Sequence, residues 1–223
     1  MSLILGGAVV DEPGLRSKSF LDHGMTWPVG TASVKRRASC VDLGVLHATG
    51  GEGPAKQVFR TLSARGYSVE FCLDRDGLVW QFLDPLAHSA AHTGGLNARS
   101  LGIEVVNSMR PYDPAGKRPK SEAIYHVVSA SATPGPDYVI RKGRKCYYLC
   151  SRRKTVTGLY PVQLEALRLL VRILSDRTAI PHWPGAHRDY VSVGDRKDLR
   201  GWIAHSAATL RHADPSLDSI GVF

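Results

Sequence analysis

The stretch "AHTGGLNARSLGIEVVN" (residues 91–107) decides which fold the sequence predicts, because it joins a polar loop to an apolar strand. "SLGIEVVN" (100–107) has the apolar character of a buried strand, yet Glu104 stands in the middle of it. An ionised carboxylate inside a sheet costs free energy unless another group pairs with it or uses it. We therefore expect Glu104 either to form an ion pair with one of the arginines or to take part in chemistry.

Strands and a helix precede this stretch. "VDLGVLH" (41–47) predicts a central strand that ends at His47 and is followed by the glycine-containing turn "ATGG". "PAKQVFRTLSARG" (54–66) predicts a helix, with a proline in its first turn and a glycine as its stop. Residues 67–84 predict a β-hairpin, because two strand-like runs flank the turn "DRDG".

The C-terminal half adds helices to these strands. "TGLYPVQLEALRLLVRILSDR" (157–177) repeats apolar residues at helical spacing and predicts a long helix. A last helix is expected over "WIAHSAATLRH" (202–212). The alternation of strands and helices predicts an α/β fold, a single domain with a central mixed β-sheet flanked by helices.

Composition shifts suggest how the chain is divided. Residues 1–37 carry turn formers and end in "KRR", which predicts an N-terminal arm laid over a domain that spans 38–213. Residues 214–223 are expected to be a C-terminal tail. Within the domain, about 108–155 lose periodicity, and from 110 to 154 there are eleven Lys/Arg against three Asp/Glu. This basic stretch is too long for an ordinary connection and is interpreted as a functional insertion.

The 223-residue chain is basic, with a net charge of +9 and a pI near 9.6. That charge suggests an anionic partner, such as nucleic acid, an acidic membrane face or an acidic cell-wall polymer; a basic surface without function is the alternative. No apolar run approaches the ~18–20 residues that span a bilayer, and the N-terminus does not have the pattern of a signal peptide. The four cysteines are expected to be reduced, although Cys146 and Cys150 have a spacing that half of a zinc site would tolerate.

Three residues form a reasonable zinc-binding set. His47 ends a predicted strand, where α/β sheets usually place ligands, and His187 and Asp198 follow in the C-terminal loop. Imidazole nitrogens and carboxylate oxygens bind Zn²⁺, and three protein ligands leave a fourth position open for water, as in catalytic sites. Glu104 would then face that water and exchange its proton. A structural role for His47 in the core or on the surface remains the alternative.

Several motifs together resemble a known family. They are, in order, "GVLHATGG", "DRDGLVWQ", "AHTGGLNARSLGIEVVN", "YPVQLEALRLLVRIL" and "GAHRDYVSVGDRKD". The series, over roughly residues 38–210, resembles the zinc-dependent N-acetylmuramoyl-L-alanine amidases, a family that includes phage endolysins and is similar to animal peptidoglycan-recognition proteins. The most specific motif is the middle one, with His-x-Gly, Asn and Ser-x-Gly-Ile-Glu.

The resemblance implies a reaction and its residues. His47, His187 and Asp198 match the family's zinc ligands, and Glu104 matches its catalytic glutamate. The bond cleaved would join N-acetylmuramic acid to L-alanine of the stem peptide in bacterial peptidoglycan. Zinc would polarise the carbonyl and lower the pKa of its water toward ~7, while Glu104 acts as base and then as acid.

Other matched positions would shape the substrate cleft. His92 and Asn97 match a loop that forms the cleft and fixes the approach of the strand. Where relatives often have a histidine in the hairpin, this chain reads "VEF", so either Glu70 or Tyr67 is expected at the cleft edge. Tyr67 is the residue assigned to substrate binding.

The segment "GDRKD" departs from the family pattern. Relatives place a lysine two residues before the acidic ligand, where it helps to stabilise the oxyanion. Here Arg196 holds that position and Lys197 is next to Asp198, and either cation would serve electrostatically. Asp195 is an alternative carboxylate ligand.

The remaining histidines and several aromatic residues have weaker assignments. The histidines expected on the surface or in loops are His88, His182, His205 and His212. The aromatic candidates for stacking on sugar rings are Tyr147, Tyr148, Trp183 and Trp202, with a core position as the alternative.

The combined reading predicts an endolysin-like enzyme that acts on peptidoglycan. Its basic surface would hold anionic cell-wall polymers or lipopolysaccharide, and no nucleic acid is expected as a partner. The protein would be made in the cytoplasm and reach the wall after release through a holin, lysis or injection. A peptidoglycan-binding module of the same fold without catalysis is the alternative function.

Overall fold

The fold is described from a computed structural model of the whole chain. Residues 2–28, 40–51, 53–107, 159–182 and 199–205 are described in full. For five further strands only the backbone is described: 32–33, 125–128, 138–141, 144–147 and 154–157.

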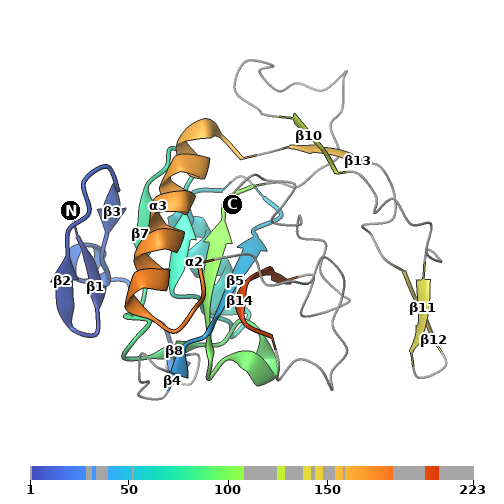
Figure 1. Cartoon of the computed structure of the whole chain (residues 1–223), viewed down its shortest axis with the longest axis horizontal. Helices are drawn as coiled ribbons and strands as arrows, with labels where there is room; N and C mark the ends of the chain where they lie inside the picture. The colour runs from blue at the N-terminus through green and yellow to red at the C-terminus, as the bar shows by residue number, and fades with distance from the viewer. Residues whose placement is uncertain are drawn as a thin grey trace.

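A six-stranded mixed sheet forms the centre of the molecule (Figure 1). Its order is β14 (Gly201–Ala204), β5 (Leu43–Ala48), β9 (Ser100–Val105), β6 (Phe71–Leu73), β7 (Val79–Gln81) and β3 (Ser17–Lys18). The first four strands run parallel, β7 is antiparallel to β6, and β3 is parallel to β7. The predicted α/β fold with a mixed central sheet is therefore confirmed, and so is the hairpin whose strands are β6 and β7.

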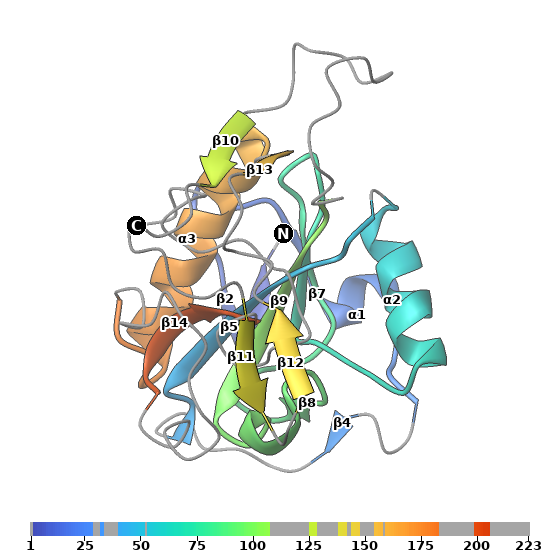
Figure 2. The ribbon, with the colours of Figure 1, turned by 90° about the vertical axis from the view of Figure 1, so that its right-hand side faces the viewer.

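Two helices cover opposite faces of this sheet (Figure 2). Helix α3 (Pro161–Arg177) packs its apolar stripe on one face, where Leu167, Leu170 and Leu174 are fully buried. Helix α2 (Ala55–Ala64) lies on the other face and packs with Trp80 in a second, aromatic-rich cluster. Both helices lie within the ranges that the sequence predicts.

Strand β9 has two different faces, because side chains alternate along a strand. Leu101, Ile103 and Val105 face the core under α3. Ser100, Gly102 and Glu104 therefore lie on the opposite face of the sheet. The alternation explains how a carboxylate stands in an apolar run: Glu104 does not enter the core under α3.

The N-terminal segment is attached to the sheet in two ways. The hairpin of β1 (Leu3–Leu5) and β2 (Ala8–Val10) contributes Leu3 and Leu5 to the main core. The side-chain amide of Gln81 also donates to the Ile4 carbonyl at 2.6 Å and accepts from the Ile4 N–H at 2.8 Å. Next come β3, the short helix α1 (Phe20–His23) and β4 (Ala32–Ser33), which pairs with β8 (Ser89–Ala90). The domain boundaries given above remain a prediction.

The helix predicted over 202–212 is wrong at its start, because residues 201–204 form strand β14. A short apolar run fits a strand as well as a helix, and the open edge of β5 decides in favour of the strand. Trp202 packs so closely over Gly44 that a Cβ there would lie 2.3 Å from its ring. Trp202 is fully buried and donates its indole N–H to Ser175 Oγ, so it belongs to the core and offers no face to a sugar.

The basic insertion contains two strand pairs in the part whose backbone is described. β10 (Tyr125–Val128) pairs with β13 (Lys154–Thr157), and β11 (Tyr138–Arg141) pairs with β12 (Arg144–Tyr147), both antiparallel. The second pair lies between the strands of the first in sequence. Among all described residues, no helix is long and apolar enough to cross a membrane.

Candidate active site

Glu104 lies between His47 and Cys72 on one face of the sheet. The parallel ladders pair His47 of β5 with Glu104 and Glu104 with Cys72 of β6, so the three side chains point to the same side. Glu104 is 8% exposed and His47 5% exposed. Burial, followed by the nearby Glu104 charge, raises the pKa of the Cys72 thiol well above its usual value. Cys72 is therefore an uncharged neighbour of the carboxylate.

His205 lies on the other side of His47, directly after β14. Its ring centroid is 4.3 Å from that of His47, and it is 7% exposed. The expectation of a surface or loop residue is wrong for His205, because β14 pairs along β5 and brings the two strand ends together. The sequence held a signal for this position: "WIAH", like "GVLH", is an apolar run that ends in histidine. Of the other histidines, His88 and His182 are exposed, as expected.

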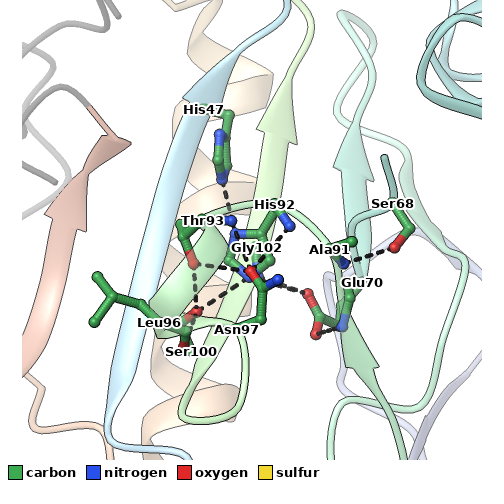
Figure 3. A network of polar contacts seen from close by, with 11 residues as sticks. His47, Ser68, Glu70, Ala91, His92, Thr93, Leu96, Asn97, Ser100 and Gly102 are labelled. Carbon is green, nitrogen blue, oxygen red and sulfur yellow. Dashed lines mark hydrogen bonds and ion pairs between the residues drawn. The ribbon is translucent and has the colours of Figure 1, made fainter. Parts of the chain in front are cut away.

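His92 lies against His47 inside the sheet–loop junction (Figure 3). Its Nδ1 is 3.0 Å from His47 Nε2, and its Nε2 is 3.2 Å from the hydroxyl oxygen of Ser100. The His92 side chain is only 2% exposed. It rests on Gly102, where an added Cβ would lie 2.8 Å from its Nδ1. The glycine of "LGIE" thus makes room for an imidazole ring.

Glu70 is a buried carboxylate that binds the backbone of the same region. Its carboxylate accepts the N–H of Gly102 at 2.7 Å and that of Ala90 at 3.0 Å. It also lies 3.9 Å from His92 Nε2. Since Glu70 is fully buried, the expectation that it faces the cleft edge is wrong. The carboxylate is held inside by backbone donors, which a sequence pattern does not reveal.

Asn97 organises the loop that carries His92. Its side-chain oxygen accepts the backbone N–H of His92 at 3.1 Å and that of Thr93 at 2.8 Å. The 3-10 turn Gly94–Leu96 precedes it and closes the loop. These bonds agree with a shape-giving role for Asn97, and contact with substrate remains a prediction.

Tyr67 lies on the surface, in the segment that precedes β6. It is 53% exposed and lies five residues before Cys72, the β6 partner of Glu104. Its assignment to substrate binding stays a prediction.

Four predicted site residues lie outside the described ranges: His187, Arg196, Lys197 and Asp198. So do Asp195, His212, Trp183, Tyr148 and the side chain of Tyr147. Their predicted roles are therefore not tested by side-chain geometry.

Leu199, the first described residue after this gap, lies beside the start of β5. Arg99 binds the carboxylate of Asp42 through two nitrogens at 2.7 and 2.8 Å and also donates to the Leu199 carbonyl. Leu199 therefore lies beside Asp42, at the end of β5 opposite to His47. Asp198 itself lies outside the described residues, so its role as a zinc ligand stays a prediction.

The donor chemistry present suits a metal with nitrogen ligands. His47 and His205 are neighbouring buried imidazoles, the side chains that Zn²⁺ accepts most readily together with carboxylates and thiolates. Within the ranges described above, no three His, Cys, Asp or Glu residues are grouped closely enough to hold a metal ion. At least one further ligand would have to come from the rest of the chain.

Comparison with known proteins identifies the family. A protein-family model described as N-acetylmuramoyl-L-alanine amidase matches residues 36–216 of the 223. The chain belongs to this family. The resemblance found from the sequence motifs is thereby confirmed, and the family's activity class is that of a peptidoglycan amidase. A search of curated proteins finds no match.

Solved structures with a similar fold include amidases and a recognition protein. The E. coli amidase AmiD, solved with a muropeptide substrate, is 15% identical, with 78% of this chain and 51% of AmiD covered and a TM-score of 0.40. The endolysin LysCS from Clostridium intestinale is 15% identical over 89% and 85%, with a TM-score of 0.46. Drosophila PGRP-SD is 12% identical over 92% and 90%, with a TM-score of 0.48. The chain thus spans about half the length of AmiD, and family membership rests on the family match.

Proposed function

We propose that the protein is a zinc-dependent N-acetylmuramoyl-L-alanine amidase that hydrolyses the bond between N-acetylmuramic acid and L-alanine in peptidoglycan. The observation that carries the proposal is the row of His205, His47 and Glu104 across three neighbouring parallel strands of a chain of this family. A row of two imidazoles and a carboxylate supplies metal ligands and a proton-transfer group side by side.

Glu104 would move the proton. A carboxylate that is 8% exposed is shielded from bulk water yet still reachable from the surface of the site. In the proposed reaction Glu104 takes a proton from the attacking water and later gives it to the departing L-alanine amine. Zinc, when bound, supplies a Lewis acid that polarises the scissile carbonyl. A cation from the segment with Arg196 and Lys197 remains the proposed stabiliser of the oxyanion.

His47, His187 and Asp198 remain the proposed zinc ligands, as the resemblance of the motifs implies. His205 is an alternative nitrogen ligand, because its ring centroid lies 4.3 Å from that of His47.

Zinc content distinguishes the two ligand sets. We expect His187→Ala and Asp198→Ala to lower the zinc bound per purified chain strongly, while His205→Ala keeps it. His88→Ala is the matched control, since His88 is an exposed histidine. Zinc loss in His205→Ala, with zinc retained in the His187 and Asp198 variants, would instead make His205 the ligand.

Product analysis tests the reaction itself. Purified protein should reduce the turbidity of cell-wall suspensions, and a chelator should stop it. Mass spectrometry should find stem peptides with a free L-alanine amine and glycan strands without peptides. Zinc-loaded protein that binds peptidoglycan but releases no peptide would favour the non-catalytic binding module.

The basic charge supports a further part of the proposal, contact with anionic wall polymers. With a net charge of +9, activity on whole cells should fall as salt screens the attraction, while activity on small muropeptides should change less. Equal salt dependence of the two substrates would exclude such contact. An endolysin-like role in lysis is proposed on the same basis.

A further inference from the structure

We propose that His92 is a positioning residue that fixes the tautomer of His47, so that His47 presents Nδ1 rather than Nε2 to the metal. The proposal rests on the proposed function of His47 as a ligand, and it concerns a histidine that the sequence assigned to substrate binding. It follows from three consecutive hydrogen bonds.

The first step concerns the Ser100 hydroxyl. Its oxygen lies 2.9 Å from the carbonyl oxygen of Leu96, 3.1 Å from the Thr93 hydroxyl and 3.2 Å from His92 Nε2. A carbonyl only accepts, so the single hydroxyl proton of Ser100 is directed to its shortest contact, Leu96. The Ser100 oxygen then accepts from His92, whose Nε2 must carry a proton.

The second step concerns the buried charge of Glu70. Its carboxylate lies 3.9 Å from His92 Nε2, and neither side chain has more than 2% exposure. In such a weakly screened position, a negative charge favours the tautomer with its N–H on the nearer nitrogen. Glu70 and Ser100 therefore favour the same tautomer of His92 independently.

The third step transfers this choice to His47. A neutral imidazole has one donor and one acceptor nitrogen, so His92 Nδ1 accepts once Nε2 carries the proton. At 3.0 Å from it, His47 Nε2 must then donate. The lone pair of His47 is consequently on Nδ1, the only nitrogen that can bind a metal in this tautomer. Partners of this kind tune metal ligands in many proteins.

The position of the His92 ring explains why it acts through His47. The ring is confined between His47 and the backbone of Gly102, and its side chain is 2% exposed. The Asn97 oxygen fixes the backbone on which the ring is carried. His92 thus has little surface to offer a glycan or a peptide.

Nitrogen-15 NMR of the full-length protein tests the tautomer without substrate. In the metal-free wild type we expect a proton on His47 Nε2, with a scalar coupling across the hydrogen bond to His92 Nδ1. Addition of zinc chloride should leave that proton in place and shift the Nδ1 resonance. A proton on His47 Nδ1, a doubly protonated His92, or loss of the Nε2 proton on zinc addition would each overturn the proposal.

Zinc affinity, measured by chelator competition, tests the role of His92. His92→Phe keeps a ring but no acceptor, and we expect its zinc affinity to fall about 10- to 100-fold. His92→Asn places an amide oxygen close to the position of Nδ1, so it keeps an acceptor for His47 Nε2 and should retain affinity within about threefold of wild type. His88→Phe is the control. Unchanged affinity in His92→Phe, or equal losses in the Phe and Asn variants, would leave His92 a merely structural residue.

The results of these measurements do not depend on whether the protein is an active amidase. A protein without amidase activity that still shows the Nε2 proton and the zinc response supports the proposal on His92. An active amidase with the opposite His47 tautomer refutes it.

Discussion

Replacing Gly102 with alanine should disturb the site through a single methyl group. The new Cβ would lie 2.8 Å from His92 Nδ1, 2.9 Å from Cγ and 3.1 Å from Cε1, all atoms of one rigid ring. To restore an ordinary contact of 3.4 Å, the ring would have to move by about 0.6 Å. Because His47 and Ser100 hold the ring on two sides, this movement lengthens at least one hydrogen bond.

Two opposing effects set the size of the change. Alanine is better than glycine within a strand by about 0.5–1 kcal/mol, because it loses less backbone entropy on folding. Overpacking a tight site costs about 1–3 kcal/mol. For a ring that cannot rotate away, overpacking is expected to prevail, and the free energy of unfolding should fall by about 1–2 kcal/mol.

Urea denaturation of the two proteins measures this difference, with Gly95→Ala as the matched control. Gly95 belongs to the same loop–strand unit, but a Cβ there meets nothing within 4 Å, so its stability should change by less than about 0.5 kcal/mol. Zinc affinity should fall in Gly102→Ala and remain in Gly95→Ala. A Gly102→Ala variant as stable as the wild type would show that the His92 ring is not confined, and would remove the basis of the reasoning.

Three further predictions concern Glu104, the core under α3 and the cysteines. Glu104→Gln should abolish release of stem peptides, while zinc content and stability are kept. The control Glu165→Gln, at an exposed position of α3, should leave the rate unchanged. A Glu104→Gln variant with a normal rate would exclude proton transfer by Glu104. Leu170→Ala should lower the free energy of unfolding by about 2–5 kcal/mol, because Leu170 is fully buried between α3 and the sheet. A loss below about 1 kcal/mol would contradict that packing. Iodoacetamide at pH 8 should label the exposed Cys40 in the native protein but the buried Cys72 only after unfolding. The raised pKa of the Cys72 thiol lowers its fraction of reactive thiolate. Peptide mass spectrometry measures the labelling, and labelling of Cys72 in the native protein would be the contrary result.

Local patterns were sufficient for most secondary structure. The strand ending in His47, the hairpin around "DRDG" and the helix that begins at Pro161 depend on signals a few residues long, and all are present. The helix predicted from 202 is wrong at its start, because a short apolar run fits both states. Only the open edge of β5, a neighbour more than 150 residues away in sequence, selects the strand.

The same distinction holds within the site. The sequence by itself determined the α/β fold, the family, and the importance of His47 and Glu104, because motifs with fixed spacing carry that information. Only the tertiary structure decided that His205 lies beside His47, that Glu70 is buried, and that His92 lies beneath the site rather than on its surface. These facts depend on strand order and register, which join residues distant in sequence and leave no periodic trace in it.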